Sequence, residues 1–152
     1  MDGWTLGRSE LVEVADGCAC KNLRRSARAV TRLYDEALRP SGLRITQFTL
    51  LVAVALSEPV PITRLADALD LDRTTLARDL KPLTERGLLE ITTGEDKRTR
   101  MVRLTVQGRE AIARAYPLWQ RAQARIVQGS GPDRWQAVAG GLEEVAALAL
   151  TS

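Results

Sequence analysis

The amino-acid sequence predicts a mainly α-helical fold with one small β-hairpin. Apolar residues recur at helical spacing through most of the 152 residues, and the alternation of apolar and polar residues that is typical of strands appears at positions 89–104. A chain of this length can bury about 68–70% of the surface that its unfolded form exposes, so it needs no disulfide or metal to fold. We therefore expect one domain over residues 1–152.

Apolar stripes predict helices at both ends of the chain. The first helix runs over residues 16–40, and Thr105 caps the first of two helices over residues 106–150. One small core cannot cover the stripes of all three, so we expect these segments to form the interface of a symmetric dimer. The alternative is an intramolecular bundle. The stripes consist of Leu23, Ala27, Val30, Tyr34 and Ala37, of residues 112–126, and of residues 135–149.

The middle of the chain, residues 45–105, begins with a core helix. Residues 46–56 are apolar almost all round, which is typical of a buried helix, and Thr46 is expected to cap it. A turn over residues 57–61 follows.

Two short helices come next. The first covers residues 62–69 with Thr63 as its expected cap, and the second covers residues 73–86 with Asp72 as its cap. The link between them is about three residues long, and Asp70 is one of the few residue types that tolerate the left-handed conformation needed there. The pair is therefore predicted to be a helix-turn-helix.

A β-hairpin is predicted after the second helix. Leu89 and Ile91 on one side, and Val102 and Leu104 on the other, alternate with polar neighbours across residues 93–99. A flexible hairpin with basic residues can reach the minor groove of DNA or its phosphates. The basic residues are Lys97, Arg98, Arg100 and Arg103.

The helix of residues 73–86 has one face free for a partner. Its leucines gather on one side, and the opposite side suits a major groove, where arginine can pair with guanine and threonine can offer a hydroxyl or a methyl group. The alternative is an ordinary solvated helix. Pro82 predicts a kink or local unwinding inside it. The outward residues are Thr74, Arg78, Lys81 and Glu85.

The expected DNA contacts come from both helices and from the hairpin. Asp96 is expected either to form a surface ion pair with Arg98 or to aim that arginine. The expected contacts are Thr63, Asp72, Arg73, Thr74, Thr75, Arg78, Lys81, Lys97, Arg98 and Arg100.

The overall charge permits a nucleic-acid partner without requiring one. The net charge is +3, and residues 64–103 hold nine basic and eight acidic residues, so the placement of charge must carry specificity. The absence of histidine removes the commonest general base and metal ligand, which disfavours an enzyme, a cofactor or a metal site. The first sixteen residues lack the apolar core of a secretory signal, and no run is long enough to span a membrane, so we expect a cytoplasmic protein.

Cys18 and Cys20 are the only thiols of the chain. On a continuous helix they would point about 200° apart and could not grip one ion together. Near a helix start, with Lys21 and Arg24 close in sequence, a thiolate would be favoured. One hypothesis is that they sense oxidants, electrophiles or a soft metal; the other is that they are small packing residues.

Five short segments follow one another through the middle of the chain. They are Ile62–Thr63–Arg64–Leu65–Ala66, Asp72–Arg73–Thr74–Thr75–Leu76, Glu85–Arg86–Gly87–Leu88, Asp96–Lys97–Arg98 and Leu104–Thr105–Val106–Gln107–Gly108–Arg109–Glu110. Together with the order of the predicted elements over roughly residues 18–150, these segments resemble the MarR family of regulators. That resemblance implies an obligate dimer, a recognition helix in the major groove, and Arg98 near the minor groove.

The residues and the resemblance together predict a sequence-specific regulator, expected to be a repressor, that binds a pseudo-palindromic double-stranded operator as a homodimer. Release would follow thiol modification or binding of a small aromatic ligand between the helical region and the winged region. Tyr34, Tyr116 and Trp119 are either residues of that pocket or ordinary core. The alternative function is a winged-helix module that binds a protein instead of DNA.

Overall fold

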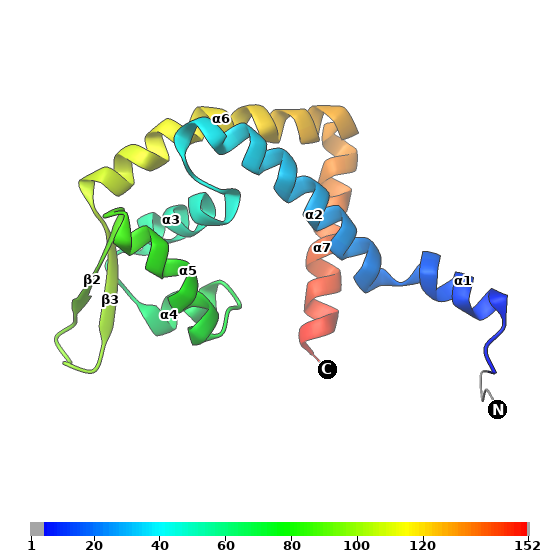
Figure 1. The fold of residues 1–152 in the computed structure, drawn as a ribbon, viewed down its shortest axis with the longest axis horizontal. Helices are drawn as coiled ribbons and strands as arrows, with labels where there is room; N and C mark the ends of the chain where they lie inside the picture. Colours follow the sequence, from blue (N-terminus) through cyan, green and yellow to red (C-terminus); the bar gives the residue numbers. More distant parts are fainter. Residues whose placement is uncertain (1–4, 152) are drawn as a thin grey trace.

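The computed structural model describes residues 5–151, and it is mainly helical with one small antiparallel sheet, as predicted (Figure 1). Along the chain the elements are α1 (Arg8–Gly17), α2 (Ala19–Leu38), η1 (Arg39–Ser41), α3 (Ile45–Ser57), β1 (Val60–Pro61), α4 (Ile62–Ala68), α5 (Arg73–Glu85), β2 (Leu89–Thr93), β3 (Arg100–Leu104), α6 (Val106–Ser130) and α7 (Pro132–Leu150).

Residues 45–104, which we call the winged lobe, enclose most of the core. The sheet has the order β1-β3-β2, and β2 and β3 form the predicted hairpin with Leu89 opposite Leu104. Helices α3, α4 and α5 pack with this sheet, and the first half of α6 contributes Ala111 and Ala115 to the same core. The largest fully buried side chains within the lobe are Leu51, Val54, Leu65, Leu76, Leu80, Leu83, Leu89 and Val102.

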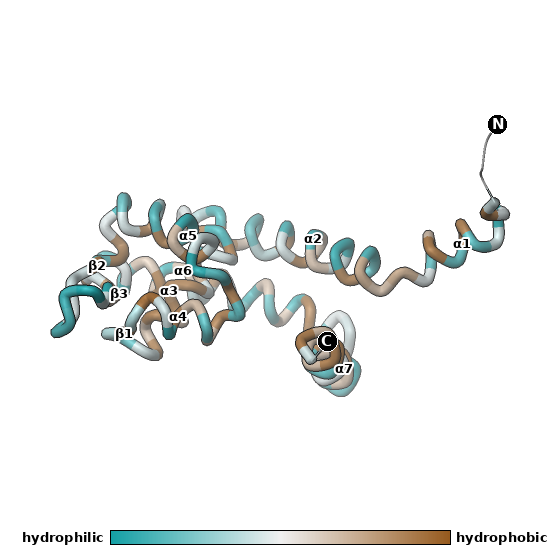
Figure 2. The backbone as a smooth tube through the Cα atoms, turned by 90° about the horizontal axis from the view of Figure 1, so that it is seen from below, coloured by the Kyte–Doolittle hydropathy of each residue, from teal (hydrophilic) through white to brown (hydrophobic). Residues whose placement is uncertain are grey.

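The terminal helices lie outside this core. Figure 1 shows α1 extending away from the body of the chain and α7 turning away from the end of α6. Neither α1 nor α7 contains a buried residue. Apolar and polar residues nevertheless alternate around both helices, as the bands of colour in Figure 2 show. On α7 the apolar side chains of Val138, Leu142 and Val145 are 44–45% exposed.

The predicted first helix is in fact two helices. The break is at Cys18, whose backbone is extended at φ −64° and ψ 110°. Side chains from α2 bind the carbonyls that end α1, because the Asn22 amide donates to the Asp16 carbonyl at 2.9 Å and the Lys21 ammonium donates to that of Ala15. The expectation of one helix over residues 16–40 is therefore wrong at its start.

Two expected caps and a turn are also corrected. Helix α3 begins one residue earlier than expected, and Asp35 of α2 accepts the Ile45 N–H at 2.7 Å, so Thr46 is not its cap. Helix α4 begins at Ile62 after Pro61, so Thr63 lies inside the helix. Part of the expected turn over residues 57–61 is the strand β1, which pairs with β3.

Pro82 does not unwind α5. The helix runs without interruption to Glu85, past the proline that was expected to disturb it. The Thr84 hydroxyl donates to the Leu80 carbonyl at 3.0 Å, and Arg86 N–H donates to the carbonyl of Pro82 at 3.2 Å. Lys81 and Glu85 therefore stay on the same helix as Arg78.

Candidate nucleic-acid interface

Helix α5 is anchored by its leucines and capped by Asp72. Leu76, Leu80 and Leu83 are at most 1% exposed. One Asp72 carboxylate oxygen accepts the backbone N–H of Thr75 at 2.9 Å, and the other accepts the Thr75 hydroxyl at 2.6 Å. The hydroxyl first, and then the N–H, hold the pKa of Asp72 below its usual value. The predicted cap is confirmed, and it orients the first turn of the helix.

The opposite side of α5 is open to solvent. Arg78 lies 3.7 Å from Asp79 and Lys81 lies 3.8 Å from Glu85, and all four side chains are at least 45% exposed. Such loose surface pairs are worth little, so both cations can turn to a polyanion at small cost. Thr75 is only half-buried, but its hydroxyl proton is committed to Asp72. The exposed polar residues of this face are Arg73, Thr74, Arg78, Lys81 and Glu85.

The tip of the hairpin is shaped by Asp96. Its carboxylate accepts the backbone N–H of Arg98 at 3.0 Å, and its carbonyl accepts the Thr99 N–H at 2.8 Å. Asp96 thus fixes the turn through the main chain, and no ion pair joins it to the Arg98 guanidinium in the part of the chain described.

The start of α4 and the hairpin share one open hollow. Thr63 lines it together with Arg98 and Arg100. These two arginines and Lys97 are exposed, and within residues 5–151 none of the three lies within 4 Å of a carboxylate. Arg103, in contrast, is paired with Glu90 at 2.6 Å. The three unpaired cations are therefore those nearest the tip.

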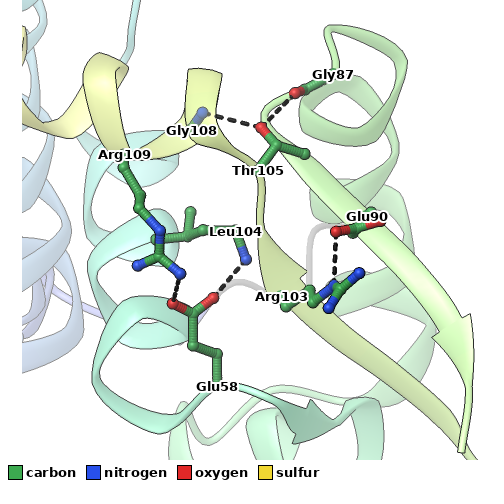
Figure 3. Close-up of polar contacts among 8 residues, drawn as sticks. All are labelled: Glu58, Gly87, Glu90, Arg103, Leu104, Thr105, Gly108 and Arg109. Atoms are coloured by element: carbon green, nitrogen blue, oxygen red, sulfur yellow. Dashed lines mark hydrogen bonds and ion pairs between the residues drawn. The ribbon is translucent and has the colours of Figure 1, made fainter.

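A polar junction joins the hairpin to α6 (Figure 3). Thr105 caps α6 as predicted, since its hydroxyl oxygen accepts the Gly108 N–H at 3.0 Å while its proton goes to the Gly87 carbonyl at 2.6 Å. Beside it, the Glu58 carboxylate accepts the Leu104 N–H at 2.5 Å and pairs with Arg109.

The junction includes two residues whose roles the sequence did not reveal. Gly108 lies so close to the preceding corner that an added Cβ would overlap the carbonyl oxygen of Leu88. The Glu58 side chain is only 12% exposed. No sequence signal marks Glu58, since its partners Leu104 and Arg109 lie 46 residues or more away. The segment Leu104–Glu110 was singled out in the sequence, but the sequence did not reveal that Gly108 is needed because the Leu88 carbonyl lies so close.

Known proteins are similar to this chain in both sequence and fold. The family model of the MarR family matches residues 41–99. The structure of the transcriptional regulator MosR of M. tuberculosis, solved in complex with DNA, is 38% identical and covers 86% of this chain and 98% of that one, with a TM-score of 0.75. This chain belongs to the MarR family.

Two further relatives extend the comparison of this MarR-family chain. The transcriptional repressor CouR, solved bound to a 23-mer DNA duplex, is 27% identical over 94% of this chain and 99% of that one, with a TM-score of 0.80. The HTH-type transcriptional regulator YwoH of Bacillus subtilis is 31% identical over 55% of this chain, and the match spans 61% of its own length. These relatives are regulators and not enzymes, which fits the expectation drawn from the missing histidines.

Three aromatic residues of this MarR-family regulator, Phe48, Tyr116 and Trp119, form a partly buried group. Trp119 of α6 lies 6.3 Å from Phe48 and 6.0 Å from Tyr116, between ring centroids. Tyr34 is buried; its hydroxyl donates to Gln123, and burial raises its pKa. Tyr116 is 49% exposed. Tyr34 and Trp119 thus pack as core residues, which leaves Tyr116 as the accessible ring.

The two cysteines lie at the break between α1 and α2. Cys18 is half-buried, Cys20 is exposed, and both thiols are free. Because Cys18 precedes the first residue of α2 and has an extended backbone, the helical angle of about 200° does not apply to this pair.

None of the helices within residues 5–151 is both long enough and apolar enough to cross a membrane.

Proposed function

We propose that this MarR-family regulator is a repressor that binds a pseudo-palindromic duplex as a homodimer. The observation that carries the proposal is the outward face of α5, with exposed Arg73, Thr74 and Arg78 above a buried row of leucines. Three unpaired cations of the hairpin flank that face. MosR and CouR, which share this fold, have both been solved with DNA.

The contacts divide into base readers and phosphate binders. Arg78 and Thr74 project from the middle of the exposed face and read base edges in the major groove. Arg98 at the hairpin tip enters the minor groove. Asp72 acts through Thr75, whose position it holds. The phosphate-binding side chains are Thr63, Arg73, Lys81, Lys97 and Arg100. Thr75, whose hydroxyl proton goes to Asp72, offers only its methyl group to the duplex.

The dimer is supported by the apolar residues that one chain leaves uncovered. Helices α1 and α7 contain no fully buried residue, and Leu23 and Val30 of α2 remain 37% exposed. If two copies pack around a two-fold axis through residues 16–40 and 106–150, these apolar faces are covered and residues 45–105 are left free to bind DNA. The half-sites of the operator would then lie about 34–36 Å apart, one turn of the duplex.

Release of DNA follows a change at one of two places. The first is the cysteine pair, since an oxidised, alkylated or metal-bound thiol at the junction of α1 and α2 would shift helices of the dimer interface. The second is the aromatic group at Tyr116 and Trp119, where a small aromatic ligand would lie between the helical region and the winged lobe.

Selection of bound duplexes from a random pool, followed by mobility shift, tests DNA recognition. Arg78→Ala should weaken binding to the selected duplex by about 1–3 kcal/mol and relax its preference at one base pair of each half-site. Arg114→Ala is a matched control, because that exposed arginine lies on α6 beside Glu110. Failure to select any sequence, with and without reductant, would remove the proposal.

The salt dependence of the same assay separates the alternative function, a winged-helix module that binds a protein. A phosphate-binding Lys97 or Arg100 contributes about 0.9 to the slope of log affinity against log salt concentration. Replacement of either residue by alanine should flatten the slope by that amount if the duplex is the partner.

The thiol hypothesis needs its own variants. Cys18→Ser and Cys20→Ser should each reduce the loss of operator binding that follows treatment with peroxide or an alkylating agent. An unchanged response in both variants would leave the small-ligand mechanism as the one to pursue.

A further inference from the structure

The strongest imbalance of charge in the chain is on α2, outside the winged lobe. Residues 17–34 contain five basic residues and no acidic one. In the winged lobe, by comparison, basic and acidic residues nearly balance. We define the basic stripe of α2 as Lys21, Arg24, Arg25, Arg28 and Arg32.

The stripe is exposed and not neutralised by neighbours. All five side chains are exposed, and within residues 5–151 none lies within 4 Å of a carboxylate. Their hydrogen bonds go to carbonyl groups, from Lys21 to Ala15 and from Arg32 to Arg28 at 3.5 Å. Like charges one helical turn apart repel each other, so the stripe is stabilised by any anion that bridges them.

The stripe faces away from the apolar side of α2. At about 100° per residue, Arg25, Arg28 and Arg32 centre about 175° from Leu23 and Val30. If α2 packs against a second copy through its apolar side, the stripe stays on the outside of the dimer. Figure 1 shows that only the end of α2 near η1 lies beside α6, and that the rest of α2 runs obliquely away from α6 toward α1, on the side of the molecule away from the hairpin.

We propose that the basic stripe binds the phosphate backbone of a second DNA segment, one that is not held by α5 and the hairpin. From Lys21 to Arg32 the helix rises about 16 Å, a length over which a duplex presents many phosphates. Four of the five cations are arginines, whose guanidinium groups match phosphate with two parallel hydrogen bonds. The contact is independent of sequence.

The proposed dimer favours DNA over a membrane surface as the partner of the stripe. A helix that lies on a membrane inserts the large apolar side chains of the face opposite its cations. On α2 that face carries Leu23 and Val30, which a second copy would cover, and Asn22, Ala29 and Thr31 beside the arginines add no large apolar side chain. A dimer with one stripe on each copy would therefore bridge its operator to a distant or separate duplex, which goes beyond the operator contacts proposed above.

A capture assay tests the bridge. The selected operator duplex is immobilised and saturated with protein, and a labelled duplex of mixed sequence without the operator is added at several salt concentrations. Wild-type protein should retain the second duplex. Arg25→Gln/Arg28→Gln should lower its retention about tenfold or more and flatten the salt slope of that step by about 1.8, because two phosphate contacts are lost.

The matched control removes the same charge elsewhere. Arg39→Gln/Arg114→Gln deletes two arginines that already lie beside Glu36 and Glu110, so it should capture the second duplex like the wild type. Operator affinity should be unchanged in both double variants. Equal loss of capture in the two variants, or no capture by the wild type, would overturn the proposal.

A further arm separates failure of the stripe from failure of the operator model. If no operator is selected at all, the protein is immobilised directly and the mixed duplex is offered to it, so the stripe is still tested. Binding of phosphatidylglycerol vesicles by the wild type, without binding of the duplex, would assign the stripe to a membrane surface and overturn the DNA contact.

Discussion

In the winged lobe, Leu76, Leu80 and Leu83 are at most 1% exposed, whereas in α7 the equivalent apolar row of Val138, Leu142 and Val145 is 44–45% exposed. Both helices carry an apolar stripe, but only α5 meets a core made by its own chain. The leucines of α5 are thus covered within one chain, whereas the apolar row of α7 would be covered only in the proposed dimer.

Charge also differs between the winged lobe and a terminal helix, in this case α2. Residues 64–103 hold nine basic and eight acidic residues, while residues 17–34 hold five basic residues alone. In the lobe, the proposed specificity would depend on where each side chain is held, and Asp72 and Asp96 hold the backbone of Thr75 and Arg98 in place. On α2 the density of charge itself would be the recognition element of the proposed contact, which suits a partner that is read by its phosphates and not by its sequence.

The largest loss of stability is expected from a substitution at the junction of the winged lobe with α6. In Gly108→Ala the new methyl group would overlap the Leu88 carbonyl, which is main chain and cannot move aside cheaply. We expect a loss of about 3 kcal/mol in the free energy of unfolding, measured by urea denaturation. Gly129→Ala is the control, because no neighbouring atom lies within 4 Å of the added Cβ; it should be neutral or stabilising by up to about 1 kcal/mol. Equal stability of the two variants would show that the junction has room.

A second expected effect is on assembly. Leu142→Glu places a charge in the apolar row of α7 and should raise the dimer dissociation constant about a hundredfold, or about 3 kcal/mol, with the lobe still folded. Light scattering after size-exclusion chromatography measures the mass. Ala147→Glu is the control, since that residue lies on the opposite side of α7. A dimer that survives Leu142→Glu would mean that α7 is covered in some other way.

At the junction, a more deeply buried polar contact should contribute more to the free energy of unfolding. Glu58→Gln weakens the partly buried contacts to Leu104 and Arg109 and should cost about 1–2 kcal/mol of unfolding free energy. Glu90→Gln, at the exposed pair with Arg103, should cost less than about 1 kcal/mol. Exchange of the Leu104 amide with solvent should quicken only in the first variant. A larger loss of unfolding free energy from Glu90→Gln than from Glu58→Gln would contradict this expectation, and would mean that the exposed pair of Glu90 with Arg103 stabilises the hairpin more.

Long, regular features of this fold were predictable from the sequence, and short or distant ones were not. The leucine spacing and Asp72 predicted α5, and alternation around a polar tip predicted the hairpin. Strand β1 is two residues long, too short to show any alternation. Helix α3 takes a cap from Asp35, ten residues upstream, where only the folded chain brings carboxylate and N–H together.

In the candidate site, too, some residues were predictable from the sequence and others were not. The cations of α5 and the hairpin were predicted because the leucine spacing defines the outward face of α5, and the alternation of apolar and polar residues defines the hairpin and its tip. The break at Cys18 was missed because side chains of α2 hold the end of α1, and an unbroken period of apolar residues hides such a break. Glu58 was missed because its partners come from another part of the chain.

The smallest expected effect concerns the cap of α5 and its dependence on pH. The Asp72 pKa is depressed in the folded chain, so the ionised carboxylate stabilises the fold at pH values above its unfolded pKa, near 3.8, and this contribution disappears as the pH falls through the lower folded value. The melting temperature of Asp72→Ala should therefore lie below that of the wild type at neutral pH, and the gap should close in acid. Asp72→Asn, which keeps an oxygen to accept the Thr75 N–H, should lie between them at neutral pH and change little with acid. A gap that stays constant down to strongly acidic pH would mean that the charge of Asp72 contributes nothing to the cap, and that the order of the first turn of α5 comes from its leucines alone.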